Sequence, residues 1–294
     1  MNVLDFQKLK DAGRKISMVT CYDYSSARAV AGSNVDCILV GDSLAMTMHG
    51  HPNTLSATTA MMALHTAAVA RGASSKFIVA DLPFLSYRKG LKEAMGSVYE
   101  LMSAGANAVK LEGVRGHADI VRHIVDSGVP VMGHLGLTPQ SVNVLGGMKV
   151  QARTGAAVEL LASQARELED AGCFSLVLEC VPTEAARKVT DLLNIPTIGI
   201  GAGSSVGGQV LVYQDLIGLN PGFEPKFLRA FANTFEIIQA ALDAFDRDVK
   251  NGNFPSESES YSDSPSPGQR VAKPAEDVAK FVSLDQLQTP AALF

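Results

Sequence analysis

Five apolar segments of the sequence end in residues that can bind a cation or transfer a proton. Four of these residues are acids, and the others are a lysine and a histidine. They are Asp42, Asp81, Lys110 with Glu112, His134 and Glu179. One acid after a strand is more often a helix cap or a solvated loop residue. Repetition after successive segments instead predicts one shared site, because parallel strands of a barrel end at the same mouth.

Three of these acids form a hard oxygen ligand set. Asp42, Asp81 and Glu112 would repel one another at close range unless a cation lay between them. Mg²⁺ prefers oxygen ligands and keeps positions open for water or substrate, and the absence of clustered cysteine and histidine argues against zinc. We therefore expect Mg²⁺, with other divalent metals possible. The alternative is a network of salt bridges between the acids and Lys110 without a metal.

Strand alternation predicts which of these side chains point inward. Residues two apart share a face of a strand, so Lys110 and Glu112 can both enter the barrel while Val109 and Leu111 pack against helices. His134 could donate a hydrogen bond to a substrate or simply order its loop. The glycines at 199, 201 and 203 could cradle a phosphate, or they could allow close approach of the backbone.

The elements needed to position these residues are visible in the hydrophobic pattern. Short apolar segments alternate with segments of helical period, which is typical of parallel strands joined by helical crossovers. The predicted strands are 16–21, 37–41, 77–81, 108–112, 130–134, 174–179, 197–200 and 210–212, and the predicted helices between them include 60–71, 90–104, 117–127, 156–171 and 183–193. This count favours an α/β fold of the (β/α)₈ TIM-barrel type over an open doubly wound sheet.

The pattern also predicts the domain organisation. Residues 1–252 are expected to form one catalytic barrel, with an amphipathic closing helix at 225–250 that packs across the barrel or against another subunit. Residues 253–294 are predicted to be a low-complexity, disordered C-terminal tail, since the segment up to Gly268 is rich in serine, glutamate and proline.

Composition excludes several classes of protein. The net charge of −5 and the scattered lysines and arginines argue against nucleic acid as a partner. The four cysteines lie far apart and form no CxxC pair, so buried reduced thiols are expected. The N-terminus lacks the apolar stretch of a secretory signal, and no segment is apolar enough to span a membrane. We therefore expect a cytoplasmic protein with no membrane partner.

The sequence resembles the 3-methyl-2-oxobutanoate (ketopantoate) hydroxymethyltransferase family over residues 5–255. The motifs that carry the resemblance are TCYD (20–23), LVGDSL (39–44), ADLPF (80–84), VKLEG (109–113), GHLGLTPQS (133–141), LECVP (178–182) and IGIGAG (198–203). Met148 and Ala152 depart from the family, which often has Tyr and Gly at these positions, and the tail beyond Pro255 is longer than usual.

The resemblance implies a barrel of the phosphoenolpyruvate/pyruvate-domain type and a reaction. A hydroxymethyl group would pass from 5,10-methylenetetrahydrofolate to 3-methyl-2-oxobutanoate, giving 2-dehydropantoate and tetrahydrofolate in pantothenate and coenzyme A biosynthesis. It also implies a homo-oligomer, often a decamer. The implied roles are metal ligation by Asp42, Asp81 and Glu112, substrate binding by Asp42, Ser43, Asp81 and Lys110, and general base catalysis by Glu179. His134 has a possible orienting role.

Two other functions compete with this one. The first is a magnesium-dependent enolate lyase of the isocitrate lyase or phosphoenolpyruvate mutase type, which would use similar acids but usually carries a mobile loop with a catalytic cysteine. The sequence has no obvious counterpart of that loop. The second is a catalytically silent barrel that acts as a scaffold, and the intact set of acids argues against it.

Overall fold

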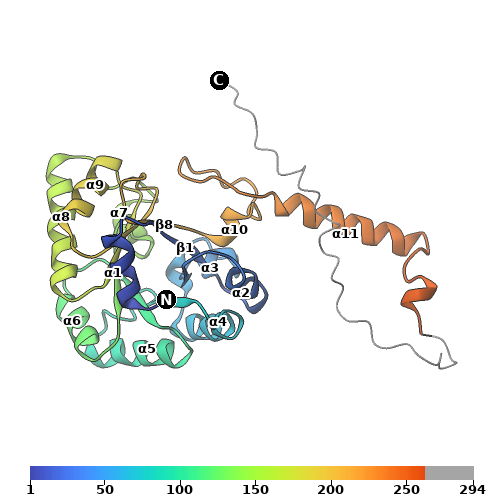
Figure 1. The fold of residues 1–294 in the computed structure, drawn as a ribbon, viewed down its shortest axis with the longest axis horizontal. Coiled ribbons are helices and arrows are strands. Elements are labelled where there is room, and N and C mark those ends of the chain that lie inside the picture. The colour runs from blue at the N-terminus through green and yellow to red at the C-terminus, as the bar shows by residue number, and fades with distance from the viewer. Residues whose placement is uncertain (262–294) are drawn as a thin grey trace, which may run out of the picture. The chain divides into compact units, whose positions relative to one another are not determined.

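The strands close into a parallel barrel. The computed structural model describes residues 1–261, and within them eight strands pair in sequence order, with β8 returning to β1 (Figure 1). The predicted (β/α)₈ fold is therefore confirmed, and each predicted strand lies within two residues of an observed one. The strands are β1 (Ile16–Thr20), β2 (Cys37–Val40), β3 (Phe77–Asp81), β4 (Ala108–Glu112), β5 (Val131–Gly136), β6 (Ser175–Glu179), β7 (Thr197–Ile200) and β8 (Gly208–Leu211).

Helices surround the barrel in the ribbon view (Figure 1). The five predicted helices are confirmed to within one residue as α4 (Thr59–Gly72), α5 (Leu91–Ser103), α6 (Ala118–Asp126), α8 (Gly155–Asp170) and α9 (Thr183–Leu192). The remaining elements of the barrel region are α1 (Val3–Asp11), α2 (Tyr24–Ala31), α3 (Leu44–Thr47), α7 (Val142–Leu145), α10 (Tyr213–Leu216) and the 3₁₀ helices η1 (Thr54–Ser56) and η2 (Pro139–Ser141).

Two hydrophobic clusters lie on opposite sides of the strands. Ala108 belongs to the cluster inside the barrel, while Val109 and Leu111 belong to the cluster between the barrel and the helices. Lys110 and Glu112 therefore share the inner face with Ala108, as strand alternation predicts.

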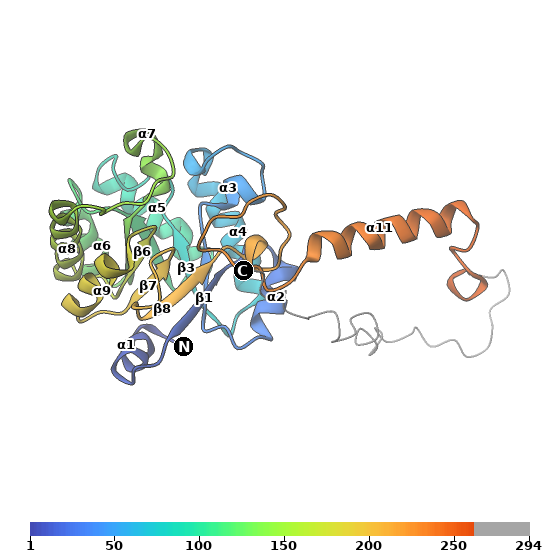
Figure 2. The same ribbon diagram turned by 90° about the horizontal axis from the view of Figure 1, so that it is seen from above.

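Helix α1 covers the N-terminal end of the barrel. Its only buried residue, Phe6, joins the inner cluster and packs edge-on against Phe77 and Phe174, with ring centroids 5.3 and 5.1 Å away. Figure 2 shows α1 at one end of the barrel and α3 and α7, which follow β2 and β5, towards the other. Apolar rings therefore fill the N-terminal end of the barrel, and the polar C-terminal ends of the strands line the opposite mouth.

The predicted closing helix at 225–250 is wrong at its N-terminal end. Helix α11 spans Thr234–Lys250, and residues 225–233 are not helical. The reason is local packing. The ring of Phe227 lies against Gly201, where an added Cβ would come within 3.0 Å of it. Residues 225–229 accordingly belong to the barrel unit, residues 1–216 with 222–229. The second unit contains residues 217–221 and α11. Within this unit the Thr234 hydroxyl donates a hydrogen bond to the Ile217 carbonyl.

The described residues after α11, 251–261, contain little regular structure. Of the predicted tail at 253–294, residues 253–261 contain the 3₁₀ helix η3 (Glu257–Glu259). Residues 262–294, which include most of the segment expected to be disordered, lie outside the described residues.

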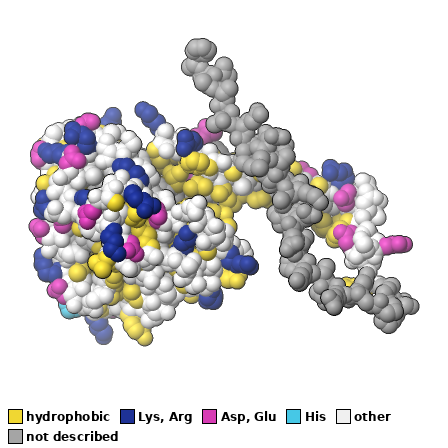
Figure 3. Space-filling view, viewed as in Figure 1, with side chains coloured by type: hydrophobic (Ala, Val, Ile, Leu, Met, Phe, Trp, Pro, Cys, Tyr) yellow, Lys and Arg dark blue, Asp and Glu magenta, His cyan; other side chains and the backbone are white. Residues whose placement is uncertain are grey.

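Two surface properties follow from residues 1–261. None of the helices in this range is both long and apolar enough to cross a membrane. On the face shown in Figure 3, lysine and arginine side chains are interspersed with acids. That face therefore carries no broad patch of one sign.

Ala152 occupies a backbone conformation that favours glycine, with φ of 52°. The left-handed conformation costs an L-residue about 1–2 kcal/mol, while glycine loses about 0.4–1 kcal/mol more chain entropy on folding. Ala152→Gly should therefore raise the free energy of unfolding by about 0.5–1 kcal/mol in urea denaturation. The matched change Ala63→Gly, inside α4, should lower it by about 1 kcal/mol. A loss of stability in both variants would contradict the strain at Ala152.

Candidate active site

The seven side chains singled out from the sequence lie in the middle or C-terminal part of the strands or directly after them. Asp81, Glu112 and Glu179 end β3, β4 and β6, while His134 lies within β5 and Lys110 within β4. Asp42 and Ser43 follow β2 directly. Successive strands therefore bring residues that are far apart in sequence to one mouth.

These side chains differ in their access to solvent. Asp42, Asp81, Lys110, Glu112 and His134 are all buried. The side chain of Glu179 keeps 18% of its surface exposed, compared with 2% for Glu112. Glu179 is thus the carboxylate of the group that a bound small molecule reaches most easily.

Asp81 connects β2 and β4. Its Oδ1 forms an ion pair with Lys110 Nζ at 2.6 Å, and its Oδ2 accepts the main-chain N–H of Asp42 at 3.1 Å. Both oxygens of the carboxylate therefore have a partner of favourable charge, and the side chain has one defined orientation.

The site carries more negative than positive charge. Burial, and then the charges of Asp81 and Glu112, hold the pKa of Asp42 well above its usual range. Burial also raises the pKa of Asp81, an effect that Lys110 offsets only in part. Burial alone would lower the pKa of Lys110, but Asp81, Glu112 and Asp42 together raise it. The excess of buried carboxylates makes the site electrostatically favourable for a further cation.

His134 lies between two of the acids. Its Nδ1 is 3.4 Å from Glu112 Oε1 and its Nε2 is 3.2 Å from Glu179 Oε2. Burial and the nearby charge of Lys110 would lower the pKa of His134, but its contacts with Glu112 and Glu179 raise it to about 9. At neutral pH the ring is therefore positively charged, and its charge between the two carboxylates holds Glu179 towards the barrel mouth.

Ser43 is held by a tyrosine that the sequence analysis did not single out. The hydroxyls of Tyr22 and Ser43 are 2.7 Å apart, and burial keeps the Tyr22 phenol protonated by raising its pKa. A Cβ on Gly41 would come within 2.9 Å of Ser43 Oγ. Glycine at this position therefore leaves room beside the Ser43 hydroxyl, where a bound molecule could accept a hydrogen bond.

Gln140 is a second residue without a role assigned from the sequence. Its side-chain amide donates to Asp42 Oδ2 at 2.8 Å, and its main-chain N–H donates to Glu112 Oε2 at 2.9 Å. A glutamine in a loop is usually exposed, and its linear context gives no sign of burial. The available signal was its position six residues after His134, in the segment that leaves β5.

The residues present fit a divalent cation by type and by charge. Asp42, Asp81 and Glu112 are buried oxygen donors, and the raised pKa of Asp42 reflects repulsion that a cation would relieve. Their oxygens bond to protein donors in this structure. Within residues 1–261, no three acidic, histidine or cysteine side chains are already arranged as a metal cluster. A cation would therefore bind with some adjustment of these side chains.

The glycine-rich segment 199–203 packs closely against its neighbours. A Cβ on Gly203 would come within 2.4 Å of Thr183 Oγ1, and a Cβ on Gly201 would come within 3.2 Å of Cys180 Sγ. These contacts favour the second interpretation of the glycines, close approach of the backbone, over a phosphate cradle.

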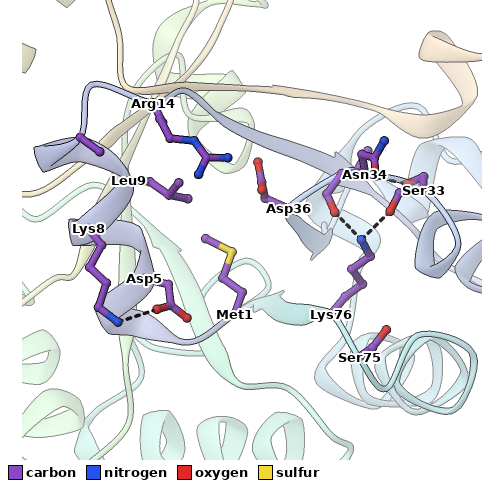
Figure 4. A pocket seen from close by; sticks show the side chains of 12 residues that line it. Met1, Asp5, Lys8, Leu9, Arg14, Ser33, Asn34, Asp36, Ser75 and Lys76 are labelled. Carbon is purple, nitrogen blue, oxygen red and sulfur yellow. Dashed lines mark hydrogen bonds and ion pairs between the residues drawn. The ribbon is translucent and has the colours of Figure 1, made fainter.

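A separate depression of about 680 Å³ lies away from the acids. Its lining comes from α1 and from the segments that precede β1, β2 and β3, which places it at the N-terminal end of the barrel. Figure 4 shows Lys8 paired with Asp5, and Lys76 Nζ donating to the Ser33 carbonyl. Lys76 Nζ also donates to the Val35 carbonyl. Its volume does not make it the candidate site, because the groups able to do chemistry lie at the other end.

Solved structures with the same fold include several enzymes. The chain is similar to 2,3-dimethylmalate lyase, a member of the phosphoenolpyruvate mutase/isocitrate lyase superfamily, with a TM-score of 0.58, 16% identity and coverage of 87% of this chain and 90% of that one. A phosphonopyruvate hydrolase complex with oxalate and Mg²⁺ has a TM-score of 0.58 at 12% identity, covering 88% of this chain and 93% of that one. At these identities the similarity shows the fold alone.

Sequence comparison identifies the family. The family model for ketopantoate hydroxymethyltransferase matches residues 1–257. The 3-methyl-2-oxobutanoate hydroxymethyltransferase of Bdellovibrio bacteriovorus is 59% identical over 260 residues, which is 88% of this chain and 99% of that protein. The enzyme of the same name from Coxiella burnetii is 56% identical over 256 residues, covering 87% and 96%. These matches confirm the resemblance seen in the motifs: the chain is a transferase that belongs to the ketopantoate hydroxymethyltransferase family.

Proposed function

We propose that this protein transfers a hydroxymethyl group from 5,10-methylenetetrahydrofolate to 3-methyl-2-oxobutanoate with the help of a divalent cation. Family membership supports the reaction and the acceptor. The observation that carries the site assignment is the meeting of Asp42, Asp81, Lys110, Glu112, His134 and Glu179 at one end of the barrel.

In this proposal, Asp42, Asp81 and Glu112 hold the cation. When bound, it would supply Lewis-acid polarisation of the 2-oxo group. Mg²⁺ suits an all-oxygen donor set, and Mn²⁺ is a practical probe of the same ligands.

The cationic and hydroxyl groups bind the acceptor. Lys110 supplies a positive charge for the carboxylate of the 2-oxo acid, and Ser43, held by Tyr22, supplies a hydrogen bond. Fixing the carboxylate in this way orients carbon 3 of the acceptor towards the more exposed acid, Glu179.

Glu179 then acts as the general base. Its carboxylate takes the proton from carbon 3, and the electron pair left on this carbon forms the new carbon–carbon bond with the one-carbon unit of the folate. The two carbon–nitrogen bonds of that unit break, a water molecule supplies the oxygen of the hydroxymethyl group, and tetrahydrofolate leaves. The charged His134 ring, whose Nε2 lies 3.2 Å from Glu179 Oε2, keeps this carboxylate in place. His134 is a positioning residue here.

The experiment that tests this function supplies the chain with both substrates and measures 2-dehydropantoate by mass spectrometry. Product should form only when the folate donor is present and should fall to background after chelation of divalent metal. Consumption of a 2-oxo acid by carbon–carbon cleavage without folate would instead identify the lyase activity. An absence of both reactions, with the fold intact, would support the silent scaffold.

We further propose that the protein is a homo-oligomer and that α11 contributes to its interface. Four apolar side chains are exposed on this helix: Phe235, Ile238, Leu242 and Phe245. An exposed apolar patch of this kind usually marks a surface that binds a partner. A chain carrying Leu242→Asp and Phe245→Asp should show a lower mass in light scattering than the wild type. Asp243→Ala on the same helix is the control. An unchanged mass in the double variant would remove α11 from the interface.

A further inference from the structure

Gln140 bonds to two of the three proposed cation ligands. Its side-chain Nε2 donates to Asp42 Oδ2 at 2.8 Å, and its main-chain N–H donates to Glu112 Oε2 at 2.9 Å. Asp42 follows β2 and Glu112 ends β4, so one residue of the β5 loop connects acids from two other strands. Gln140 itself is buried.

The orientation of the side-chain amide is set by three neighbours, which are Asp42, Leu82 and Tyr87. The second hydrogen of Nε2 points to the Leu82 carbonyl at 3.0 Å, and Oε1 lies 3.0 Å from the Tyr87 hydroxyl. In the flipped orientation Oε1 would face two acceptors, Asp42 Oδ2 and the Leu82 carbonyl, which no neutral amide can satisfy. Only one orientation therefore fulfils every hydrogen bond.

Tyr87 stabilises this orientation through its hydroxyl group, which lies next to Gln140 Oε1. Its hydroxyl accepts the main-chain N–H of Glu112 at 3.2 Å and has one proton to donate. This proton has two acceptors at 3.0 Å, the Glu112 carbonyl and Gln140 Oε1. Because the Glu112 carbonyl also accepts from Arg88 at 3.1 Å, it does not depend on the Tyr87 proton, which can serve Gln140 Oε1. The phenol and the amide thus form a chain of hydrogen bonds that ends on Asp42.

We propose that Gln140, oriented by Tyr87, is a positioning residue that holds the Asp42 and Glu112 carboxylates for the divalent cation. The inference rests on the function proposed above. The donors occupy Oδ2 of Asp42 and Oε2 of Glu112, which fixes the rotation of each carboxylate and aims the other oxygen. Groups that orient metal ligands in this way commonly contribute tenfold or more to metal affinity.

A purely structural role would have a different signature. Loss of a buried hydrogen bond at any place in the barrel lowers thermal stability, but a cation bound well below the melting temperature is sensitive only to the groups around it. Ser175 provides a matched control, because its hydroxyl donates to the Pro196 carbonyl at 2.9 Å inside the barrel, at the start of β6.

The test measures Mn²⁺ binding to the full chain by calorimetry, without substrates, together with the melting temperature. Gln140→Met keeps the volume and removes the amide, and it should weaken Mn²⁺ binding by about 10- to 100-fold. Tyr87→Phe should weaken it less, and it should have little further effect when Gln140→Met is already present, because Tyr87 acts through the amide. Ser175→Ala should lower the melting temperature without changing Mn²⁺ affinity.

The outcomes separate this inference from the proposed function. If the wild type binds Mn²⁺ and Asp42→Asn abolishes binding, but Gln140→Met and Tyr87→Phe bind as tightly as the wild type, the role of Gln140 is overturned and the proposed cation site stands. If the wild type binds no Mn²⁺, the cation site fails and Gln140 loses its role with it. Should Gln140→Met not fold, Tyr87→Phe alone decides, since unchanged affinity in that variant contradicts the proposal.

Discussion

Replacing Glu179 by glutamine should slow the exchange of the carbon 3 proton of 3-methyl-2-oxobutanoate with deuterated water by about 10²- to 10⁴-fold, the usual contribution of a general base. Glutamine keeps the shape of the side chain but cannot accept a proton at neutral pH. Nuclear magnetic resonance follows this exchange directly. It needs no folate, so it isolates the proton-transfer step.

The same variant should bind Mn²⁺ as well as the wild type, because Glu179 is not among the proposed ligands. Glu159→Gln is a suitable control, since Glu159 is an exposed acid paired with Lys188 on the outer helices. Retained exchange in Glu179→Gln would show that another group is the base. Loss of exchange together with loss of Mn²⁺ binding would indicate that the change disrupts the whole site.

The strand ends could be predicted from the sequence because two simple rules act on them. Buried parallel strands are apolar throughout, so a polar residue that ends one is conspicuous, and a barrel brings all such ends to one mouth. Alternation then assigned Lys110 and Glu112 to the inner face, and the two hydrophobic clusters confirm this. These predictions depended only on the spacing of residues within a strand.

The contacts made by loops could not be predicted in the same way. The role of Gln140 depends on meeting Asp42, Leu82 and Tyr87, which lie in the loops after two other strands. Similarly, residues 225–233 have apolar side chains at helical spacing, yet Phe227 packs on the backbone of Gly201 instead. Spacing along the chain carries no information about such partners, because tertiary contacts override local preference.

The site has two parts that differ in burial and in charge. The acids proposed to bind the cation are fully buried and mutually repelling, while Glu179 is partly exposed and contacts only His134 among the charged groups of the site. A buried, repelling cluster stabilises a bound cation and destabilises the protein without it. Function at this site should therefore oppose stability.

Asp42→Asn should raise the stability of the metal-free protein while weakening Mn²⁺ binding by at least about 100-fold, more than the loss of a group that only orients a ligand. The pKa of Asp42 is raised in the folded state by burial and by Asp81 and Glu112. At neutral pH the carboxyl group is ionised in the unfolded chain, so the raised pKa in the folded state lowers stability. Asparagine removes the charge and can still accept the hydrogen bond from Gln140. Exchanges of this kind commonly add about 0.5–2 kcal/mol.

The pH dependence provides the check on this cause. For an acid whose folded pKa lies above the unfolded value, the destabilisation appears as pH rises from the unfolded towards the folded pKa, and it is absent in strong acid where both states are protonated. The advantage of Asp42→Asn over the wild type, measured by calorimetry in chelator, should therefore shrink as pH falls. Asp36→Asn removes an acid that bonds to Ser17 at the opposite end of the barrel, and it should leave Mn²⁺ affinity unchanged. A melting temperature for metal-free Asp42→Asn below that of the wild type at neutral pH would mean that repulsion among the three acids is not what the cation relieves.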